Sequence, residues 1–442
     1  MNRTFENFPW GISSSFGGIV NKSYRNWKTD TSGLDFFIYS CGLPNLSFSY
    51  DGISSWSGNS IQSSRIAGAG ASTNIKIAKL KAIAESAERY AASVLLEGEY
   101  VFASALELEK EIIDLKPVID CVNAEIDNTN GRMSRFDPDF PIRWVPGWCL
   151  IENRQKYVPA VMTHLFPRPQ HGEMFWLPIT TGVAAHTSFK HAAISAICEV
   201  IERDALGLNW LTNRVLPRIE CEDGFDQSEE TQEQIRESIR SDTNFHFFNA
   251  TTDIKVPTVY TIESNNRSSK LANVVSCCTD FSWKNAVGST IRELASTKTA
   301  LGAYEETVPE SAEQCNELEH GAVFMAQNSK SKHFSSLLSS KNIFQMSQYD
   351  SLSEYSKEAQ IRYLISQIKP HTSDLIIVDM TTDDLREFGL FVVRAVIPGL
   401  MPMSTDYNYR YIGHPRLMKF ARDYVDKDFD LSMINKMPQA FA

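Results

Sequence analysis

The sequence lacks the segments and motifs that define several large classes of protein. It has no run of about 18 apolar residues, the length a membrane span needs, and Met1–Gly18 contains no apolar core of a signal peptide. None of its 8 cysteines forms a C-x-x-C pair, no histidines stand at zinc-finger spacing, and no G-x-x-x-x-G-K-[ST] motif is present. We therefore expect a cytoplasmic protein with no membrane association, no structural zinc site and no P-loop.

Positive charge is scarce as well. The formal net charge is −11, and the lysines and arginines are spread along the chain, not gathered into runs. This distribution argues against nucleic acid or an anionic membrane as the main partner. With 43% hydrophobic and 22% charged residues, a chain of 442 residues can build a large folded core.

Three segments share a pattern that predicts strand–turn–helix units. In each, an alanine stands seven residues before a glutamate and apolar residues recur at helical spacing, over residues 78–89, 192–203 and 286–293. Each segment follows a strand-like or small-residue stretch, at residues 63–73, 177–188 and 274–282. We therefore expect a mixed α/β fold with helices laid against a sheet, and small-residue turns that let the backbone approach a phosphate.

The first two predicted helices each contain the motif E-x-x-E-R, which supplies Glu85 with Glu88 and Glu199 with Glu202. The i, i+3 spacing puts both carboxylates on one helix face. The second motif lies in a mostly apolar helix, which should be buried, and buried carboxylates need cations such as Mg²⁺ to offset their charge. The alternative is a solvated helix face with local ion pairs. One motif alone would favour that alternative, whereas two copies favour a functional cluster.

The remaining segments are interpreted from their composition. The apolar runs Ala272–Cys278 and Leu375–Met380 predict buried strands, so the vicinal Cys277 and Cys278 are interpreted as structural and not as a redox pair. Asp223–Ser241 predicts a charged surface helix. We expect an N-terminal segment over residues 1–60 that contributes to the core, and a main domain over 61–442, catalytic by the resemblance described next, with an exposed insertion at about 328–358.

These motifs together resemble the YcaO family of ATP-dependent cyclodehydratases. The resemblance runs in order from about residue 63 to the C-terminus. It rests on both E-x-x-E-R motifs and on four further segments: Gly68-Ala69-Gly70, T-G-x-A-A at Thr181–Ala185, E-V-I-E-R-D-A at Glu199–Ala205, and the strand ending in P-G-L at Val392–Leu400. It implies a YcaO-like fold in which the strand–turn–helix units surround a central ATP site.

The resemblance also implies roles for individual residues. Four glutamates would hold Mg²⁺: Glu85, Glu88, Glu199 and Glu202. Arg203 would contact the triphosphate, and the glycine turn with Gly68 and Gly70 would lie beside the nucleotide. Three further nucleotide contacts, Thr187, Ser195 and Lys298, depart from the residue types common in the family (Asn, Gln and Arg) but keep hydrogen-bonding or cationic character.

The end of the sequence bears on the subclass. Azoline-forming members often end in a P-x-P-x-P tail that reaches the active site, and here Pro438 matches the first proline while Ala440 and Ala442 replace the others. A catalytic tail would use Pro438 and the terminal carboxylate of Ala442 to position or deprotonate a reacting group. The alternative is a frayed terminus without a role.

By this resemblance the chain would phosphorylate a backbone amide oxygen of a ribosomal precursor peptide and form thiazoline or oxazoline rings at Cys, Ser or Thr. The implied partners are an E1-like protein that binds the leader peptide and a flavin-dependent dehydrogenase in one synthetase complex. Two alternatives stay open. One is a family member that makes thioamides or amidines, and the other is a nonenzymatic scaffold that binds nucleotide.

Overall fold

The computed structural model describes residues 8–14, 18–20, 22–26, 36–43, 68–129, 131–165, 170–220, 243–265, 267–304, 306–346 and 352–441. The chain divides into two compact units. The first unit comprises Met1–Asn26, Ile38–Val200 and Lys357–Leu400, and the second comprises Trp27–Phe37, Ile201–Ser356 and Met401–Ala442. Helix α5 (Phe189–Leu211) contributes residues to both.

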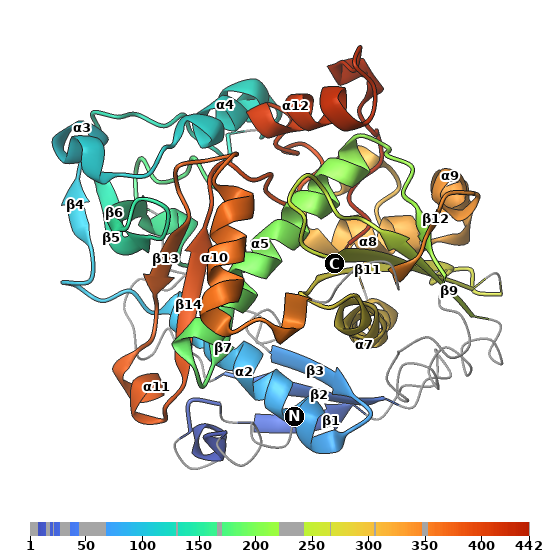
Figure 1. Ribbon diagram of the computed structural model, residues 1–442, viewed down its shortest axis with the longest axis horizontal. Coiled ribbons are helices and arrows are strands. Elements are labelled where there is room, and N and C mark those ends of the chain that lie inside the picture. Colours follow the sequence, from blue (N-terminus) through green and yellow to red (C-terminus); the bar gives the residue numbers. More distant parts are fainter. Residues whose placement is uncertain are drawn as a thin grey trace. The chain divides into compact units, whose positions relative to one another are not determined.

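A small sheet and one long helix follow each other early in the chain. The sheet has the strand order β1 (Lys22–Asn26), β2 (Phe37–Gly42) and β3 (Gly68–Ser72), and helix α2 (Ile75–Ser93) packs against β3 (Figure 1). Asn74 caps α2, since its side chain accepts hydrogen bonds from the backbone N–H groups of Lys76 and Ile77. A Cβ atom on Gly70 would lie 2.3 Å from the Ala78 carbonyl oxygen, so only glycine permits this close packing.

The first unit also contains a six-stranded antiparallel sheet. Its order is β4 (Val101–Ala103), β5 (Ile142–Cys149), β13 (Ile376–Asp379), β14 (Phe391–Val396) and β7 (Val183–His186), with β6 (Arg154–Pro159) paired to β5. The helices of this unit besides α2 and the first part of α5 are α3 (Ala105–Leu108), α4 (Lys116–Glu125), α10 (Lys357–Ile368) and α11 (Asp383–Glu387).

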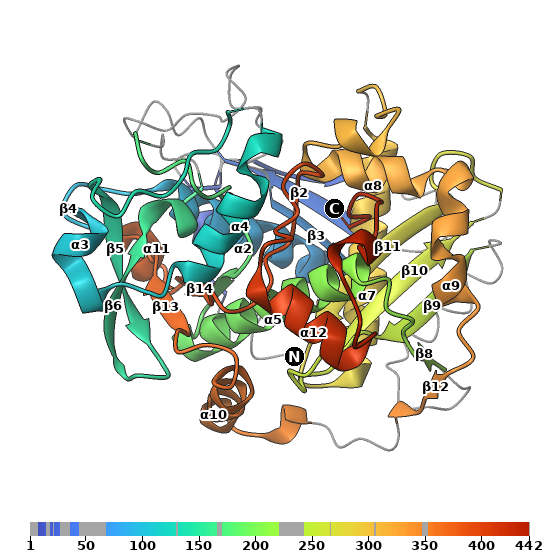
Figure 2. The same ribbon diagram turned by 90° about the horizontal axis from the view of Figure 1, so that it is seen from above.

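The second unit is built on a five-stranded sheet. Its order is β11 (Asn273–Thr279), β10 (Thr258–Ser264), β9 (Asn244–Asn249), β8 (Arg218–Ile219) and β12 (Ile343–Phe344), and only β8 and β12 pair in parallel (Figure 2). Helix α7 (Trp283–Gly302) packs against β10 and β11. The other α-helices among the described residues of this unit are α8 (Leu318–Ala326), α9 (Ser335–Leu338) and α12 (Pro415–Tyr424).

Short 3₁₀ helices connect these elements. They span Trp10–Ile12, Glu109–Glu111, Ile126–Thr129, Ala160–Met162, Ala312–Gln314, Asn328–Phe334, Leu352–Glu354 and Leu431–Met433. Within the described residues, no helix is both long and apolar enough to cross a lipid bilayer.

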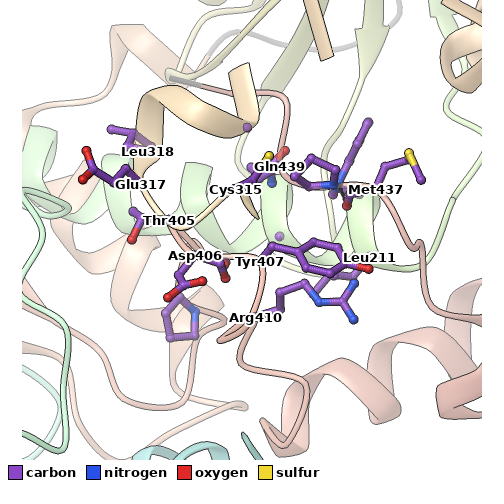
Figure 3. Close-up of a pocket in the computed structure, with 16 residues that line it drawn as sticks. Leu211, Cys315, Glu317, Leu318, Thr405, Asp406, Tyr407, Arg410, Met437 and Gln439 are labelled. Atoms are coloured by element: carbon purple, nitrogen blue, oxygen red, sulfur yellow. Dashed lines mark hydrogen bonds between the residues drawn. The ribbon is translucent and has the colours of Figure 1, made fainter. Parts of the chain in front are cut away.

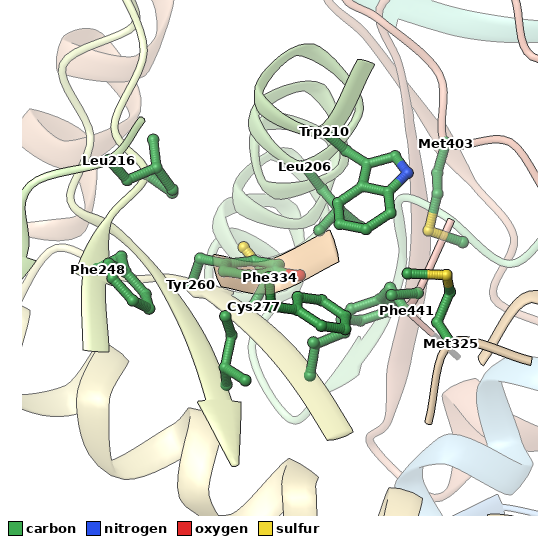
Figure 4. Packing of buried hydrophobic residues seen from close by; sticks show 14 of the residues in the cluster. Leu206, Trp210, Leu216, Phe248, Tyr260, Cys277, Met325, Phe334, Met403 and Phe441 are labelled. Carbon is green, nitrogen blue, oxygen red and sulfur yellow. The ribbon is translucent and has the colours of Figure 1, made fainter. Parts of the chain in front are cut away.

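The core of the second unit is a large hydrophobic cluster beside the five-stranded sheet. Figure 4 shows Trp210, Phe248, Phe334 and Phe441 among its members. Phe248 and Phe334 are fully buried, and Phe441 is 6% exposed. Ala440 and Phe441 therefore belong to the core of this unit.

The predicted mixed α/β fold is confirmed, and so are the three repeated helices, which are α2, α5 and α7. The predicted buried strands are β11 and β13. The expectation of one shared sheet is wrong, because β3, β7 and β11, the strands that precede the three helices, lie in three different sheets. Helices α2 and α7 pack against the strands that precede them, β3 and β11, but strand pairing depends on long-range contacts that the repeat does not encode.

A second correction concerns Gly68-Ala69-Gly70, which forms the start of strand β3 and not a turn. The glycines are needed there because the strand lies so close to α2. The predicted helix Asp223–Ser241 lies outside the described residues. In the segment 328–358, Phe334 is buried and β12 pairs with β8, while most of the other described side chains are exposed or half-buried. The division into residues 1–60 and 61–442 stays a prediction.

Candidate functional site

The two glutamates of the first E-x-x-E-R motif are both tied to backbone amides of strands. Glu85 Oε2 accepts a hydrogen bond of 2.8 Å from the N–H of Ala69 in β3, and its Oε1 pairs with Arg89 at 2.8 Å. Glu88 Oε1 accepts a hydrogen bond of 2.7 Å from the N–H of Ala185 in β7. Glu85 and Glu88 are therefore each oriented by a main-chain donor, and the Glu85 side chain remains 34% exposed.

The first glutamate on α5 is held in the same way. Glu199 Oε2 accepts a 3.0 Å hydrogen bond from the N–H of Gly182, directly before β7. Gly182 has φ +82°, and a Cβ atom on it would lie 2.6 Å from the Ala395 carbonyl oxygen and 2.9 Å from Val200. Only glycine fits this position, and its geometry aims the backbone N–H at Glu199.

In the second unit, Glu202 and Arg203 form a pair with a fixed geometry. Glu202 Oε2 accepts a 3.0 Å hydrogen bond from the N–H of Thr279 at the end of β11. Its Oε1 pairs with Arg203 Nη1 at 2.7 Å. The Arg203 guanidinium also lies over the ring of Phe441, 4.3 Å from the ring centroid.

Each of the four glutamates thus accepts a hydrogen bond from a different backbone N–H, on or beside β3, β7 or β11. These are the strands that precede the three repeated helices. A carboxylate held by a main-chain donor has a fixed orientation, which is the property a metal or phosphate site requires.

The carboxylates of the first unit repel one another. Burial raises the pKa of Glu88 well above its usual range, and the neighbouring Glu85 and Glu199 raise it further, against the hydrogen bond from Ala185. Such a group favours either a proton or a bound cation. A proton would neutralise Glu88 alone, whereas a bound Mg²⁺ would relieve the repulsion among Glu85, Glu88 and Glu199.

Arg394 on β14 is a charged residue near Glu199 that the sequence reasoning missed. It is 4% exposed, and burial lowers its pKa to about 10, an effect that Glu199 opposes. Nη1 donates to the Thr163 carbonyl oxygen at 3.0 Å, and Nε has no partner among the described residues. The sequence feature that could have identified Arg394 is its place as a single arginine in the otherwise apolar segment V-V-R-A-V.

The donor set fits Mg²⁺ in chemical type. Carboxylate oxygens are the ligands it prefers, and it usually keeps several waters and takes only one or two carboxylates besides substrate phosphates. Within the described residues, no three His, Cys, Asp or Glu side chains converge to hold an ion on their own. The arrangement therefore suits an ion that arrives with phosphate ligands and not one held in a closed protein cage.

The predicted nucleotide contacts lie in several places. Thr187 is half-buried just before α5, and Ser195 is exposed on that helix. Gly68 and Gly70 face α2, where a Cβ atom on either would clash with the helix backbone. The structure gives Lys298 a different partner, because this residue is 3% exposed on α7 and pairs with the buried carboxylate of Glu263.

Of the two predicted catalytic residues at the end of the chain, Ala442 lies outside the described residues. Pro438 is buried and lines a hollow of about 450 Å³ in the second unit that includes open solvent (Figure 3). The other lining residues are Gly207, Trp210, Leu211, Cys315, Glu317, Leu318, Gly321, Pro402, Ser404, Thr405, Asp406, Tyr407, Arg410, Met437 and Gln439. Both catalytic roles stay predictions.

Asp204, the aspartate of E-V-I-E-R-D-A, is another residue that the sequence reasoning did not single out. It is fully buried and pairs with Arg416 on α12 through two contacts, of 2.6 and 2.7 Å. It also accepts a 2.8 Å hydrogen bond from the N–H of Met401, while Arg416 pairs further with Asp253 at 2.6 Å. This network fixes the half of α5 that carries Glu202 and Arg203.

An α/β fold with paired glutamates on strand-tethered helices defines a class of proteins suited to binding a metal and a phosphate. A family model described as YcaO cyclodehydratase, ATP- and Mg²⁺-binding, matches residues 69–401. The chain therefore belongs to the YcaO family, whose members are ATP-dependent enzymes.

Solved structures agree on the fold. A heterocyclase in complex with substrate and cofactor superimposes with a TM-score of 0.80 at 18% identity, over 99% of this chain and 57% of that one. YcaO from Methanopyrus kandleri, bound with AMPPCP and Mg²⁺, gives 0.62 at 17% identity over 88% of each chain. A chain of the E. coli microcin synthetase McbBCD complex with pro-MccB17 bound gives 0.62 at 15% identity, over 97% of this chain and 99% of that one.

These identities are low, so the likeness shows the fold alone. The chain spans little more than half the length of the heterocyclase. No curated protein sequence matches it.

Proposed function

We propose that this chain is an ATP-dependent cyclodehydratase that phosphorylates a backbone amide oxygen of a ribosomal precursor peptide. The side chain of a substrate Cys, Ser or Thr loses its S–H or O–H proton and attacks the preceding amide carbonyl, and the resulting oxyanion takes the γ-phosphoryl group of ATP with release of ADP. Phosphate then leaves together with the amide N–H proton, and their loss forms the C=N bond of a thiazoline or oxazoline ring. Phosphorylation is needed because an amide oxygen is a poor leaving group.

The observation that carries the proposal is the tethering of Glu85, Glu88, Glu199 and Glu202 to backbone amides. These carboxylates would hold Mg²⁺, which offsets negative charge on phosphoryl oxygens. Arg203, kept beside Glu202 by their ion pair, would orient the triphosphate. Thr187 and Ser195 are proposed as hydrogen-bonding contacts to the nucleotide.

The nucleophile belongs to the substrate, so the protein needs no reactive cysteine. In keeping with this, burial raises the pKa values of Cys277 and Cys278 well above the usual thiol range. We propose that the peptide is presented by an E1-like partner that binds its leader sequence. A flavin-dependent dehydrogenase would complete the assembly, and the likeness to a chain of the McbBCD complex is in keeping with action in a multi-protein complex.

The test combines phosphate release with mass spectrometry of candidate peptides. We expect phosphate release to depend on Mg²⁺ and peptide, and the peptide to lose the mass of one water per ring. Glu199→Gln and Glu202→Gln should stay folded but lose ATP use, whereas Glu310→Gln, at an exposed position, should behave as the wild type. Normal ATP turnover by either of the first two variants would refute the proposal.

The alternatives give different products. A thioamide-forming enzyme would consume sulfide and replace oxygen by sulfur, and an amidine-forming enzyme would close a ring onto an amine. A nonenzymatic scaffold would bind Mg²⁺ and nucleotide without releasing phosphate under any substrate condition.

A further inference from the structure

Arg203 is held on two sides in the second unit. On one side its Nη1 pairs with Glu202 at 2.7 Å, and Glu202 is itself fixed by the N–H of Thr279 at 3.0 Å. On the other side its guanidinium lies over the ring of Phe441 at 4.3 Å. The ring comes from the far end of the sequence, so this contact exists only in the folded chain.

The segment that carries Phe441 is docked by specific contacts. Asn435 donates from its backbone N–H to the Leu211 carbonyl oxygen at 2.8 Å, and from Nδ2 to the Trp210 carbonyl oxygen at 3.1 Å. Trp210 Nε1 donates to the Met437 carbonyl oxygen at 3.3 Å. These contacts fix the segment to the end of α5, the helix that also carries Arg203.

Two further features fix the ring itself. Phe441 is 6% exposed and belongs to the same hydrophobic cluster as Phe334 and Trp210 (Figure 4). Gly321 on α8 lies so close that a Cβ atom there would be 2.3 Å from the Gln439 carbonyl oxygen. The position of the ring is therefore set by packing, independently of Arg203.

A rigid aromatic ring restricts the guanidinium that lies over it to one plane. The cation–π attraction between the ring and the guanidinium is stronger where water is excluded. Arginine is otherwise a long side chain with many conformations, and ordering it on ligand binding costs affinity. The ring and Glu202 together order Arg203 before any ligand arrives.

We propose that Phe441 is a positioning residue that acts through Arg203, holding its guanidinium in the orientation that meets the triphosphate. The inference rests on the proposed function, in which Arg203 contacts the nucleotide. The inference attributes the effect of the segment that carries Phe441 on nucleotide binding to the aromatic ring of Phe441. This effect is separate from any role of Pro438 or Ala442.

The alternative is that Phe441 only fills space in the core. Phe441→Leu separates the two roles, because leucine keeps an apolar side chain but has no ring face. Phe441→Tyr keeps the ring. Phe334→Leu is the matched control, since Phe334 is fully buried in the same cluster, whereas the ring that lies over Arg203 is that of Phe441.

The measurement is calorimetric binding of a non-hydrolysable ATP analogue with Mg²⁺ to the full chain, with thermal unfolding in parallel. We expect Phe441→Leu to raise Kd by about five- to tenfold, and Phe441→Tyr to stay within about twofold. Phe334→Leu should lower Tm but leave Kd within about twofold. Gly321→Ala, which displaces the segment, should weaken binding as Phe441→Leu does.

A double-variant test isolates the route through Arg203. In an Arg203→Met background, Phe441→Leu should have no further effect on Kd. Wild-type affinity in Phe441→Leu, or an additive loss in the double variant, would overturn the inference alone. Unchanged affinity in Arg203→Met, or no binding by the wild type, would instead overturn the proposed role of Arg203 and the inference with it.

Discussion

Glu88 on α2 accepts a hydrogen bond of 2.7 Å from the backbone N–H of Ala185 on β7, a residue 97 positions away. This bond joins the first repeated helix to the strand that precedes the second. Burial raises the pKa of Glu88, and the charges of the nearby Glu85 and Glu199 raise it further. A carboxylate held in such surroundings favours a cation.

The pH dependence of stability should report the raised pKa of Glu88, which burial and the neighbouring carboxylates together produce. Because the folded-state pKa of Glu88 is raised, the folded protein binds its proton more tightly, and stability is lost as pH rises through that pKa. We therefore expect Glu88→Gln, which can still accept from Ala185, to have the higher Tm at pH 8 without metal. The two proteins should converge at low pH, where both side chains are neutral, and Mg²⁺ with nucleotide should stabilise only the wild type.

Glu107 provides a control in which the pKa is shifted in the opposite direction. Its pKa is lowered by hydrogen bonds from Ser104, its partner in the capping box of α3. Glu107→Gln should therefore lose a little stability at neutral pH and none at low pH. A lower Tm for Glu88→Gln than for the wild type at pH 8 would contradict the raised pKa of Glu88.

Gly182 should not tolerate alanine. Its φ of +82° and the 2.6 Å approach to the Ala395 carbonyl oxygen make a side chain both strained and obstructed. Gly389 has a φ of +72° but open space around it, so an alanine there introduces backbone strain without a steric clash. In urea unfolding we expect Gly389→Ala to cost about 1 kcal/mol and Gly182→Ala about 2–4 kcal/mol.

Gly182→Ala should also weaken Mg²⁺-dependent nucleotide binding, because the N–H that orients Glu199 would move. Equal stability losses in the two glycine variants would show that the close approach does not matter.

The buried pair of Lys298 and Glu263 leads to a prediction about both stability and binding. Lys298→Met leaves Glu263 charged and buried, which should cost about 3–5 kcal/mol. The double variant Lys298→Met with Glu263→Leu should recover most of that loss in denaturant unfolding. Its nucleotide affinity then tests the predicted contact of Lys298 with the nucleotide: wild-type affinity would assign the lysine to the core, and a clear loss would support the contact.

Asp204 should matter more to stability than Asp253, the other carboxylate that pairs with Arg416. The Asp204 side chain is fully buried and binds both Arg416 and the Met401 N–H, whereas the Asp253 side chain is 12% exposed and pairs with Arg416. We expect Asp204→Asn to cost about 2–4 kcal/mol in denaturant unfolding and Asp253→Asn less than about 1 kcal/mol. Equal losses would mean that Arg416 depends on both carboxylates alike.

Local pattern identified the helices correctly. The alanine-rich segments around Glu85, Glu199 and Glu293 are helices because their apolar spacing and small residues favour this state wherever they lie in the fold. The Gly68–Gly70 segment was misread for the opposite reason. Glycine is typical of turns, but here the close packing of β3 against α2 requires it, and no local rule distinguishes these two uses.

The surroundings of the glutamates could not be predicted. That Glu88 meets Ala185, that Lys298 meets Glu263, and that Phe441 lies over Arg203 each depends on two segments far apart in the chain. Arg394 in V-V-R-A-V and Asp204 after E-V-I-E-R can be seen in the sequence, but their roles follow only from their partners in the folded chain.

By itself, the sequence determined the family, the mixed α/β class, the repeated helices and the pairing of carboxylates on one helix face, because these follow from spacing and residue type within a single segment. Only the tertiary structure decided which strand each helix covers, which backbone N–H holds each glutamate, and which charges are buried with a partner. Those features are set by contacts between segments that are far apart in the sequence. The energies of such contacts depend on burial and distance, which the local sequence does not specify.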